Sequence, residues 1–419
     1  MKVKKWKVLG LAGALVLGYA VSSNAGVMLK AGENTYADFG FWTQVKFDTM
    51  TKLDEGGKTT YTFDVPDARI TIEGKMTKDV EFFSDVVMSA SNNAALEEGG
   101  LNIAVMPEFQ VRIGKIRVPF TREQLIPSYS SVVANGAWWD PQEIWGVEIF
   151  NNPSFMQSGA NIGPAGLLED VNAGAVFHGE IPGGLFKYAV GLFNEGERLG
   201  DTNAGLEVTA RLEFTPVMLG FKPAPSIETK GWESDTYFGK AGDILTIGLG
   251  LMKTTAIDKG ATTNFWINAP DDLKPFGIGV DAFFEKKLPG APFVLDLTGG
   301  FVSISDSHFY KNASNQLEKG DTTYYYAQAQ GLIDQTFGIG KPAFYLRYEG
   351  AKADYYDKTN DATYSRFAVG CNYYIKDAVE KINIGIDHVS YSDGIKNTLS
   401  RWNKKDSVTD FYVQLQVMF

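Results

Sequence analysis

Hydrophobic and polar residues alternate along much of the chain with a period of two, which is the pattern of a β-strand with one apolar and one polar face. In segment 38–47, Phe39 and Phe41 fall on one face, whereas Gln44 and Lys46 fall on the other. The run is close in length to the roughly 9–11 residues that a tilted strand needs to cross a bilayer. The segment therefore predicts a strand that is long enough to span a membrane.

The same alternation returns along the chain up to its last residue. It is clear in segments 68–73, 206–214, 344–349 and 410–419. Glycine-rich turn signals separate such segments, for example Glu55-Gly56-Gly57. The last segment alternates as a strand up to Phe419 itself, so we expect that residue to be paired within a sheet, as closure of a barrel would require.

A membrane β-barrel explains this pattern better than the alternative, a secreted soluble β-sandwich. Strands of soluble sheets also alternate, but they average about 5–6 residues. The chain contains 28 Phe and 19 Tyr, yet no apolar run after residue 25 is long enough for a membrane helix. Abundant aromatic residues hidden at every second position are typical of barrel strands. We therefore predict an all-β fold, a transmembrane antiparallel β-barrel that occupies residues 26–419.

The first 25 residues have the order of a secretory signal peptide. Four lysines precede an apolar stretch at 8–20, and the small residues Ser23 and Ala25 follow it. Cleavage after Ala25 would start the mature chain at Gly26. An uncleaved anchor is the alternative, but the stretch is short against the roughly 20 apolar residues of a spanning helix. We therefore expect export through a cleaved signal peptide, residues 1–25.

Charge and the few reactive side chains exclude several classes of function. Removing residues 1–25 removes four lysines and no acid, so the mature net charge is (39 − 4) − 50 = −15. This excess of acid argues against a nucleic-acid partner, which needs a basic face. Three scattered histidines and a single cysteine, Cys371, show no metal-ligand or haem-attachment spacing. No nucleophile-and-base motif stands out, so we expect no enzyme, no metal and no cofactor.

Four segments carry a resemblance to a known family. They are FQVRIGKIRVPFTREQL at 109–125, GGLFKYAVGLFNEGE at 183–197, ARLEFTPV at 210–217 and RFAVGCNYYIKDAVEKINIGIDH at 366–388. In this order and spacing, and with a last strand that ends on Phe, they resemble the phosphate-selective porin O/P family of Gram-negative outer membranes. The resemblance implies a sixteen-stranded barrel, usually a homotrimer, that serves passive uptake. It also implies that Phe419 is an assembly signal for the barrel-assembly machinery.

A long connection after the first of these segments is the expected constriction. The stretch from Gln124 to about Gly159 is far longer than a hairpin turn, and it contains Asp140 and Glu143 among three tryptophans. In a porin, a loop of this kind folds into the lumen and narrows the pore. We therefore assign residues 124–159 to an inward constriction loop.

The segment that leads into this loop carries a basic cluster. Its apolar residues change parity around Gly114, and a β-bulge there would explain the change. Such a bulge would turn Lys115 and Arg117 toward the lumen, beside the loop. Together with Arg112 they form the candidate anion site at the constriction.

The other charges on the polar strand faces mix both signs. Besides the basic cluster and the loop acids, the pore-lining candidates are Arg69, Arg211, Glu213, Arg347 and Glu349. In two strands an arginine precedes a glutamate by two residues on the same face, so we expect each pair to neutralise itself rather than form a binding ladder. An acidic total favours cations, whereas a basic constriction favours anions because field lines focus there. The sequence therefore leaves the sign of selectivity open.

These features favour an outer-membrane porin for passive diffusion of small hydrophilic solutes or ions, with oxyanions such as phosphate as one substrate class. Its expected partners are outer-membrane lipid, the transported solutes, the assembly machinery and further copies of itself. The alternative is a barrel sheath around an inserted partner, for example in a porin-cytochrome electron-transfer complex. A porin should conduct alone, whereas a sheath purified with its partner should conduct poorly.

Overall fold

The structure is a computed structural model of the chain. It describes residues 27–50, 59–88, 94–134, 171–194, 205–225, 232–254, 274–311, 317–353, 362–392 and 407–419. Nearly all regular structure in these ranges is β-strand, and the helices described are single 3-10 turns. These are η1 (Glu123–Leu125), η2 (Ser128–Ser130) and η4 (Val217–Leu219).

Strands follow one another along the whole described chain. Those of the first half are β1 (Val27–Gly32), β2 (Thr35–Met50), β3 (Thr60–Lys75), β4 (Val80–Met88), β5 (Ala94–Met106), β6 (Phe109–Arg117), β7 (Val171–Glu180), β8 (Phe186–Asn194) and β9 (Leu206–Phe214). Those of the second half are β10 (Ile244–Thr254), β11 (Phe276–Lys287), β12 (Phe293–Lys311), β13 (Leu317–Ile333), β14 (Lys341–Ala353), β15 (Ala362–Lys376), β16 (Glu380–Tyr391) and β17 (Ser407–Met418).

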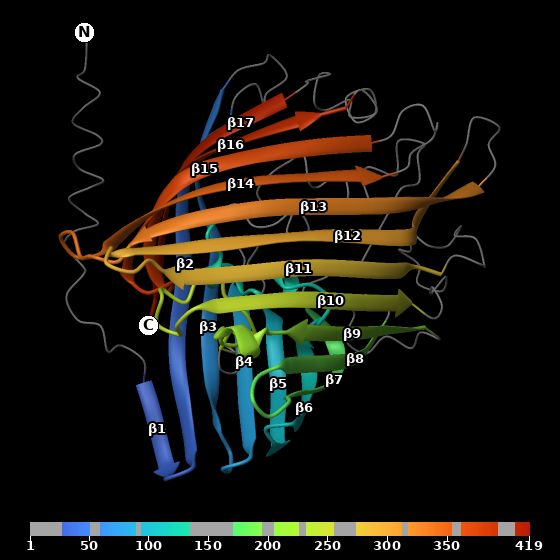
Figure 1. The fold of residues 1–419 in the computed structure, drawn as a ribbon, viewed down its shortest axis with the longest axis vertical. Helices are drawn as coiled ribbons and strands as arrows, with labels where there is room; N and C mark the ends of the chain where they lie inside the picture. The colour runs from blue at the N-terminus through green and yellow to red at the C-terminus, as the bar shows by residue number, and fades with distance from the viewer. Residues whose placement is uncertain are drawn as a thin grey trace.

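The strands close into a single barrel (Figure 1). Each strand from β2 to β16 pairs antiparallel with the next one, and β17 pairs with β2, so sixteen strands form a closed ring. β1 adds a further strand beside the start of β2. The sequence-based prediction of an all-β, sixteen-stranded antiparallel barrel is thus confirmed.

The seam of the barrel lies along β2. β1 pairs with residues 35–39 of this strand, and β17 pairs with residues 42–50. Phe419 continues the ladder between them: its N–H donates to the backbone oxygen of Phe41 at 3.0 Å and its own oxygen accepts from the N–H of Phe41 at 2.7 Å. The expectation that Phe419 is paired within a sheet is therefore confirmed.

The polarity of the barrel is inverted relative to a soluble protein. On β14, Phe344 and Leu346 are 60% and 51% exposed on the outer face, whereas Arg347 and Glu349 are 1% and 0% exposed on the inner face. The same division follows the alternating sequence pattern on β10, β11 and β15–β17. An apolar outer band around a polar interior, with backbone groups paired between strands, suits a surrounding lipid. No helix in the described part of the chain is both long and apolar enough to cross a membrane.

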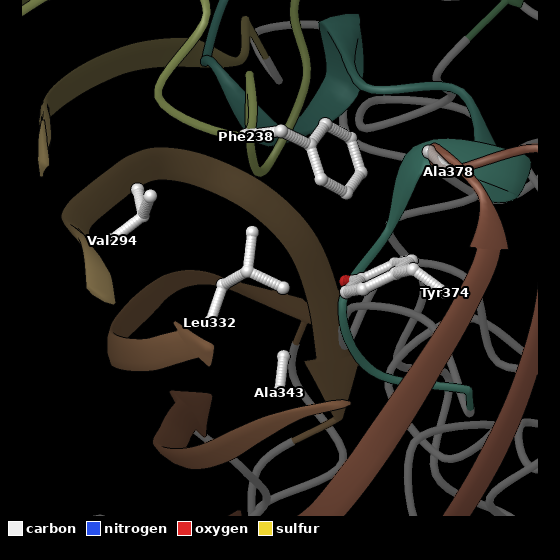
Figure 2. Packing of buried hydrophobic residues seen from close by; sticks show 6 residues of the cluster. All are labelled: Phe238, Val294, Leu332, Ala343, Tyr374 and Ala378. Atoms are coloured by element: carbon white, nitrogen blue, oxygen red, sulfur yellow. The ribbon is translucent and has the colours of Figure 1, made fainter. Parts of the chain in front are cut away.

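The two ends of the barrel differ in their connections. At one end the turns are short, for example residues 76–79 between β3 and β4 and residues 377–379 between β15 and β16. The connection between β9 and β10, residues 215–243, lies at this same end and is the long exception. Part of it packs inside the barrel wall, where Phe238 contacts an apolar cluster of side chains from β12–β15 (Figure 2). This connection therefore occupies the lumen as well as the rim.

Candidate functional site

Residues 118–134, the first inward segment, cross the interior of the barrel. The segment leaves β6, yet Asn372 on β15 and Asn383 on β16 donate hydrogen bonds from Nδ2 to the backbone oxygen of Val132, at 2.9 and 3.0 Å. Neither strand is a neighbour of β6 in the ring. The segment therefore lies in the lumen, held by the far wall.

Two further contacts fix the course of the first inward segment. The backbone N–H of Arg122 donates to Oδ2 of Asp281 on β11 at 3.0 Å. Gln416 on β17 donates from Nε2 to the backbone oxygen of Tyr129 at 2.9 Å. Because side chains from several strands satisfy backbone groups of the segment, its position is set by many small contributions rather than by one.

A second segment enters the lumen from the opposite end. Residues 232–238, the second inward segment, belong to the long β9–β10 connection. The backbone N–H of Tyr237 donates to Oε2 of Glu285 on β11 at 2.6 Å, and Gly239 donates to Oε1 of the same carboxylate at 2.9 Å. A buried carboxylate that accepts several backbone N–H groups orients the chain around it.

The two inward segments are bonded to each other. The backbone N–H groups of Trp232 and Glu233 both donate to the backbone oxygen of Leu125 at 3.2 Å. The N–H of Val132 donates to Oδ2 of Asp235 at 2.9 Å. Sequence reasoning missed the second segment, and the signal that could have found it is the length of the 215–243 connection.

A buried ion-pair network lies where the first inward segment meets β14–β16. Arg347 binds Oε2 of Glu349 through Nε at 2.6 Å and also pairs with Glu123 of the segment. Arg366 bridges Oε1 of Glu349 at 3.2 Å and Oδ2 of Asp387 at 2.8 Å. The side chains of all five residues are at most 6% exposed. The predicted pairing of Arg347 with Glu349 is confirmed, within a larger network than the sequence indicates.

Acid outnumbers base in these ion pairs, because three carboxylates (Glu123, Glu349 and Asp387) share the guanidinium groups of Arg347 and Arg366. The excess falls on Glu123, the carboxylate that belongs to the inward segment and not to the wall. Burial raises the pKa of Glu123 to about 7, although Arg347 opposes the rise. The anchor of the first inward segment therefore titrates near neutral pH.

The second arginine–glutamate pair on one strand, Arg211 and Glu213, is farther apart than the sequence-based prediction implies. Arg211 on β9 lies 3.5 Å from Glu213, but it binds Asp281 on β11 more closely, with 2.6 Å between Nη1 and Oδ2. The backbone oxygen of Phe120 accepts a further bond from Arg211 at 3.4 Å. The sequence does not reveal Asp281 as the main partner, because the two residues lie on strands separated by β10.

The structure does not keep the three residues of the predicted basic cluster together as free cations. Arg117 forms an ion pair with Glu98 at 2.8 Å and donates to the backbone oxygen of Gln124 at 3.0 Å. Lys115 donates from Nζ to the backbone oxygen of Leu96 at 3.1 Å. Both side chains are therefore engaged in holding β5, β6 and the start of the inward segment.

Arg112 differs from both. Its guanidinium carbon lies 4.4 Å from the ring centroid of Phe83 and 5.6 Å from that of Trp232 in the second inward segment. Within the described residues it forms neither an ion pair nor a hydrogen bond, and its Nε is buried without a partner. Arg69, by contrast, is paired with Asp67 at 2.5 Å.

The expected β-bulge near Gly114 is wrong. β6 pairs with β7 in unbroken register from Gln110 to Arg117, and its register with β5 shifts only at the opposite end. Gly114 instead adopts a φ of 147°, a backbone conformation open to glycine, and a Cβ there would lie 2.1 Å from the oxygen of Gly99. The ladder between β6 and β7 therefore passes Gly114 without an inserted residue.

Several sequence-based assignments lie outside the described residues. They include the signal peptide, residues 1–25, and the loop from 135 to 159 with Asp140 and Glu143. The described part of the predicted loop, residues 124–134, belongs to the first inward segment. Among the residues that the structure describes, no group of three or more His, Cys, Asp or Glu side chains is arranged to hold a metal ion.

Comparison with known sequences identifies a partial relative but no family. No family model matches the chain. An uncharacterised protein from Aquifex aeolicus is 27% identical over 296 residues, which cover 64% of this chain and 56% of that protein. The chain thus matches little more than half the length of this relative. The resemblance to phosphate-selective porins stays a hypothesis.

Comparison with solved structures agrees with the barrel. An anion-selective porin from Comamonas acidovorans has a TM-score of 0.53 at 13% identity, over 91% of this chain and all of that one. OmpT of Vibrio cholerae has a TM-score of 0.52 at 9% identity, over 94% of this chain and all of that one. OmpF of Salmonella typhi, in a complex with daunomycin, has a TM-score of 0.51 at 10% identity, over 93% of this chain and all of that one. The chain therefore has the fold of outer-membrane porins.

Proposed function

We propose that this protein is an outer-membrane porin that admits small hydrophilic solutes or ions by passive diffusion. The observation that carries the proposal is the first inward segment, which crosses a polar lumen and is held there by side chains of the opposite wall. A segment fixed across the interior narrows the path that a solute takes through the lumen. It leaves the apolar outer face of the barrel free to contact lipid. The porin fold of the solved structures supports the same function.

The occupied lumen favours a narrow pore over a sheath for a partner protein. Many inner-wall residues on strands around the ring, from Gln44 on β2 to Arg366 on β15, are buried. The two inward segments cover much of the wall between β9 and β17. A sheath needs room for a second polypeptide, whereas a small solute needs only the gaps that packed polar side chains leave.

We further propose that most of the pore-lining candidates shape the lumen and do not bind solute. Arg69, Arg117, Arg211 and Arg347 each have a carboxylate partner, so they present little net charge. Asp140 and Glu143 belong to the proposed constriction. Selectivity then depends on few uncompensated groups, and oxyanions such as phosphate remain one candidate class.

Conductance of the purified protein in planar bilayers tests the function. We expect stepwise currents from folded protein alone, with a conductance that rises when residues 138–145 are deleted from the proposed constriction loop. A folded barrel that never conducts, with or without this deletion, would contradict a porin. The reversal potential in a salt gradient then gives the sign of selectivity.

Location and assembly form the second part of the proposal. We propose that the chain loses residues 1–25, reaches the outer membrane as a homotrimer and uses Phe419 as its assembly signal. Deleting Phe419 removes the last rung beside Phe41 and should lower the yield of heat-modifiable barrel in outer-membrane fractions. Unchanged yield, or an intact Met1 in the inner membrane, would argue against this route.

A further inference from the structure

Arg112 is the exception among the described arginines. All the others have a carboxylate partner: Arg69 with Asp67, Arg117 with Glu98, Arg122 with Glu233, Arg211 with Asp281, Arg347 with Glu349 and Arg366 with Asp387. Arg112 is 5% exposed and has none within the described chain. Leaving a buried cation unpaired is costly in free energy. Such a group therefore either destabilises the folded protein or binds a ligand that carries the opposite charge.

The surroundings of Arg112 leave its donors open. The guanidinium of Arg112 lies over the rings of Phe83 and Trp232, whose faces attract the cation but provide no oxygen acceptor. The N–H groups radiate in the plane, and Nε of Arg112 is buried without an acceptor. Nε1 of Trp232 is likewise buried without an acceptor. Two adjacent side chains that can only donate hydrogen bonds thus lack an acceptor.

The neighbouring polar groups do not supply that acceptor. Asn102 lies opposite Arg112 in the ladder of β5 and β6, but its Oδ1 contacts Nε2 of His178 at 3.0 Å. Its Nδ2 donates to Oε1 of Gln110 at 3.0 Å. These amides are neutral and satisfy one another, so they give Arg112 neither an acceptor nor a counter-charge. Glu98, the carboxylate with the largest electrostatic effect on Arg112, forms its ion pair with Arg117 instead.

We propose that Arg112 and Trp232 bind the carboxylate of a small organic acid. A planar guanidinium fork matches the two oxygens of a carboxylate, and one cation balances one negative charge. A phosphate dianion would bring a second charge that no described side chain of the site balances, and the aromatic rings favour an apolar body. The transport role of this site rests on the proposed porin function, whereas binding itself does not.

Calorimetric titration of the full mature barrel in detergent with sodium benzoate, and separately with inorganic phosphate, tests the site. We expect benzoate to bind more tightly than phosphate. Arg112→Met should weaken benzoate binding by about tenfold or more, as loss of a charge-assisted pair implies. Arg112→Lys, which keeps the charge without the fork, and Trp232→Phe should each weaken it less. Lys341→Gln removes a surface cation away from the site and should leave binding unchanged.

Thermal unfolding of the same variants separates binding from structure. In anion-free buffer, Arg112→Met should unfold at or above the temperature of the unchanged protein, because it removes an unpaired buried charge. Benzoate should raise the unfolding temperature of the unchanged protein but not that of Arg112→Met. Three outcomes would contradict the proposed site: an Arg112→Met protein that is less stable than the unchanged protein, phosphate binding that is tighter than benzoate binding, and benzoate binding that Arg112→Met does not weaken. Benzoate binding through Arg112 in a barrel that does not conduct would uphold the site and refute the porin.

Discussion

On the β14–β16 side of the barrel, Arg347 and Arg366 share three carboxylates, whereas Arg112 on β6 forms no ion pair with a carboxylate in the described chain. All three arginines face the lumen and are almost completely buried. Residue type and strand face therefore do not decide what an inward arginine does. Its partners decide: a paired arginine fixes an inward segment, and an unpaired one is free to meet a solute.

The largest expected effect comes from breaking the paired side. Arg347→Met would leave Glu123 and Glu349 buried without their main partner, which should cost about 3–5 kcal/mol of unfolding free energy. Urea unfolding of refolded barrel in detergent measures this loss. Arg112→Met is the matched comparison, since it removes the same side chain from an unpaired position. Equal losses at the two positions would contradict the contrast between the two sides.

The pH dependence of the paired side follows from Glu123. Its pKa in the folded protein, about 7, lies above the ordinary value of 4.5. The corresponding stability is therefore fully present below pH 4.5 and is lost as the pH rises through 7, and the whole loss is on the order of 3 kcal/mol. Glu123→Gln, which stays neutral, should remove this decline. Unfolding measured between pH 5 and 8 checks it, and parallel curves for the two proteins would speak against it.

A smaller effect is expected from loosening the anchor of the first inward segment. Asn383→Leu removes the hydrogen bonds to the oxygen of Val132 and to Oδ1 of Asn372, which should cost about 1–2 kcal/mol. A freed segment should raise the mean conductance and its fluctuations in planar bilayers. If conductance stayed the same despite the loss of stability, this segment would not restrict the pore.

The smallest effect is expected at the rim. Lys341 pairs with Asp334 at 2.5 Å, but Lys287 binds the same carboxylate, and both lysines are partly exposed. Lys341→Gln should therefore change the unfolding free energy by less than about 1 kcal/mol. Urea unfolding checks this value. A larger loss would show that rim pairs contribute as much as those inside.

The sequence predicts the faces of the strands better than the contacts inside the ring. Alternation alone places Phe344 outward and Arg347 inward, since a strand has only two faces. It also predicts the pair of Arg347 and Glu349, because both residues lie on one strand two positions apart. Local spacing is enough for Arg347 and Glu349, but not for Arg211 and Glu213, because Arg211 binds Asp281 of another strand more closely.

The spacing of residues along one strand does not predict contacts between distant strands. Asp281 binds Arg211 across an intervening strand, and the second inward segment reaches the first through the backbone oxygen of Leu125. Neither contact leaves a periodic trace in the sequence. The lack of an ion pair at Arg112 cannot be predicted from the sequence for the same reason, because it depends on carboxylates of other strands that pair with other side chains.

The ring closes only when β17 pairs with β2 beyond the part of that edge that β1 occupies. This pairing brings Gln44 and Gln416, which are 372 positions apart in sequence, into contact. A contact of such long range forms slowly, since a large loop must lose its conformational freedom first. Until then one edge of β2 presents unpaired backbone groups that another chain can join. Refolding of this barrel should therefore compete with aggregation, and its yield should fall as the protein concentration rises.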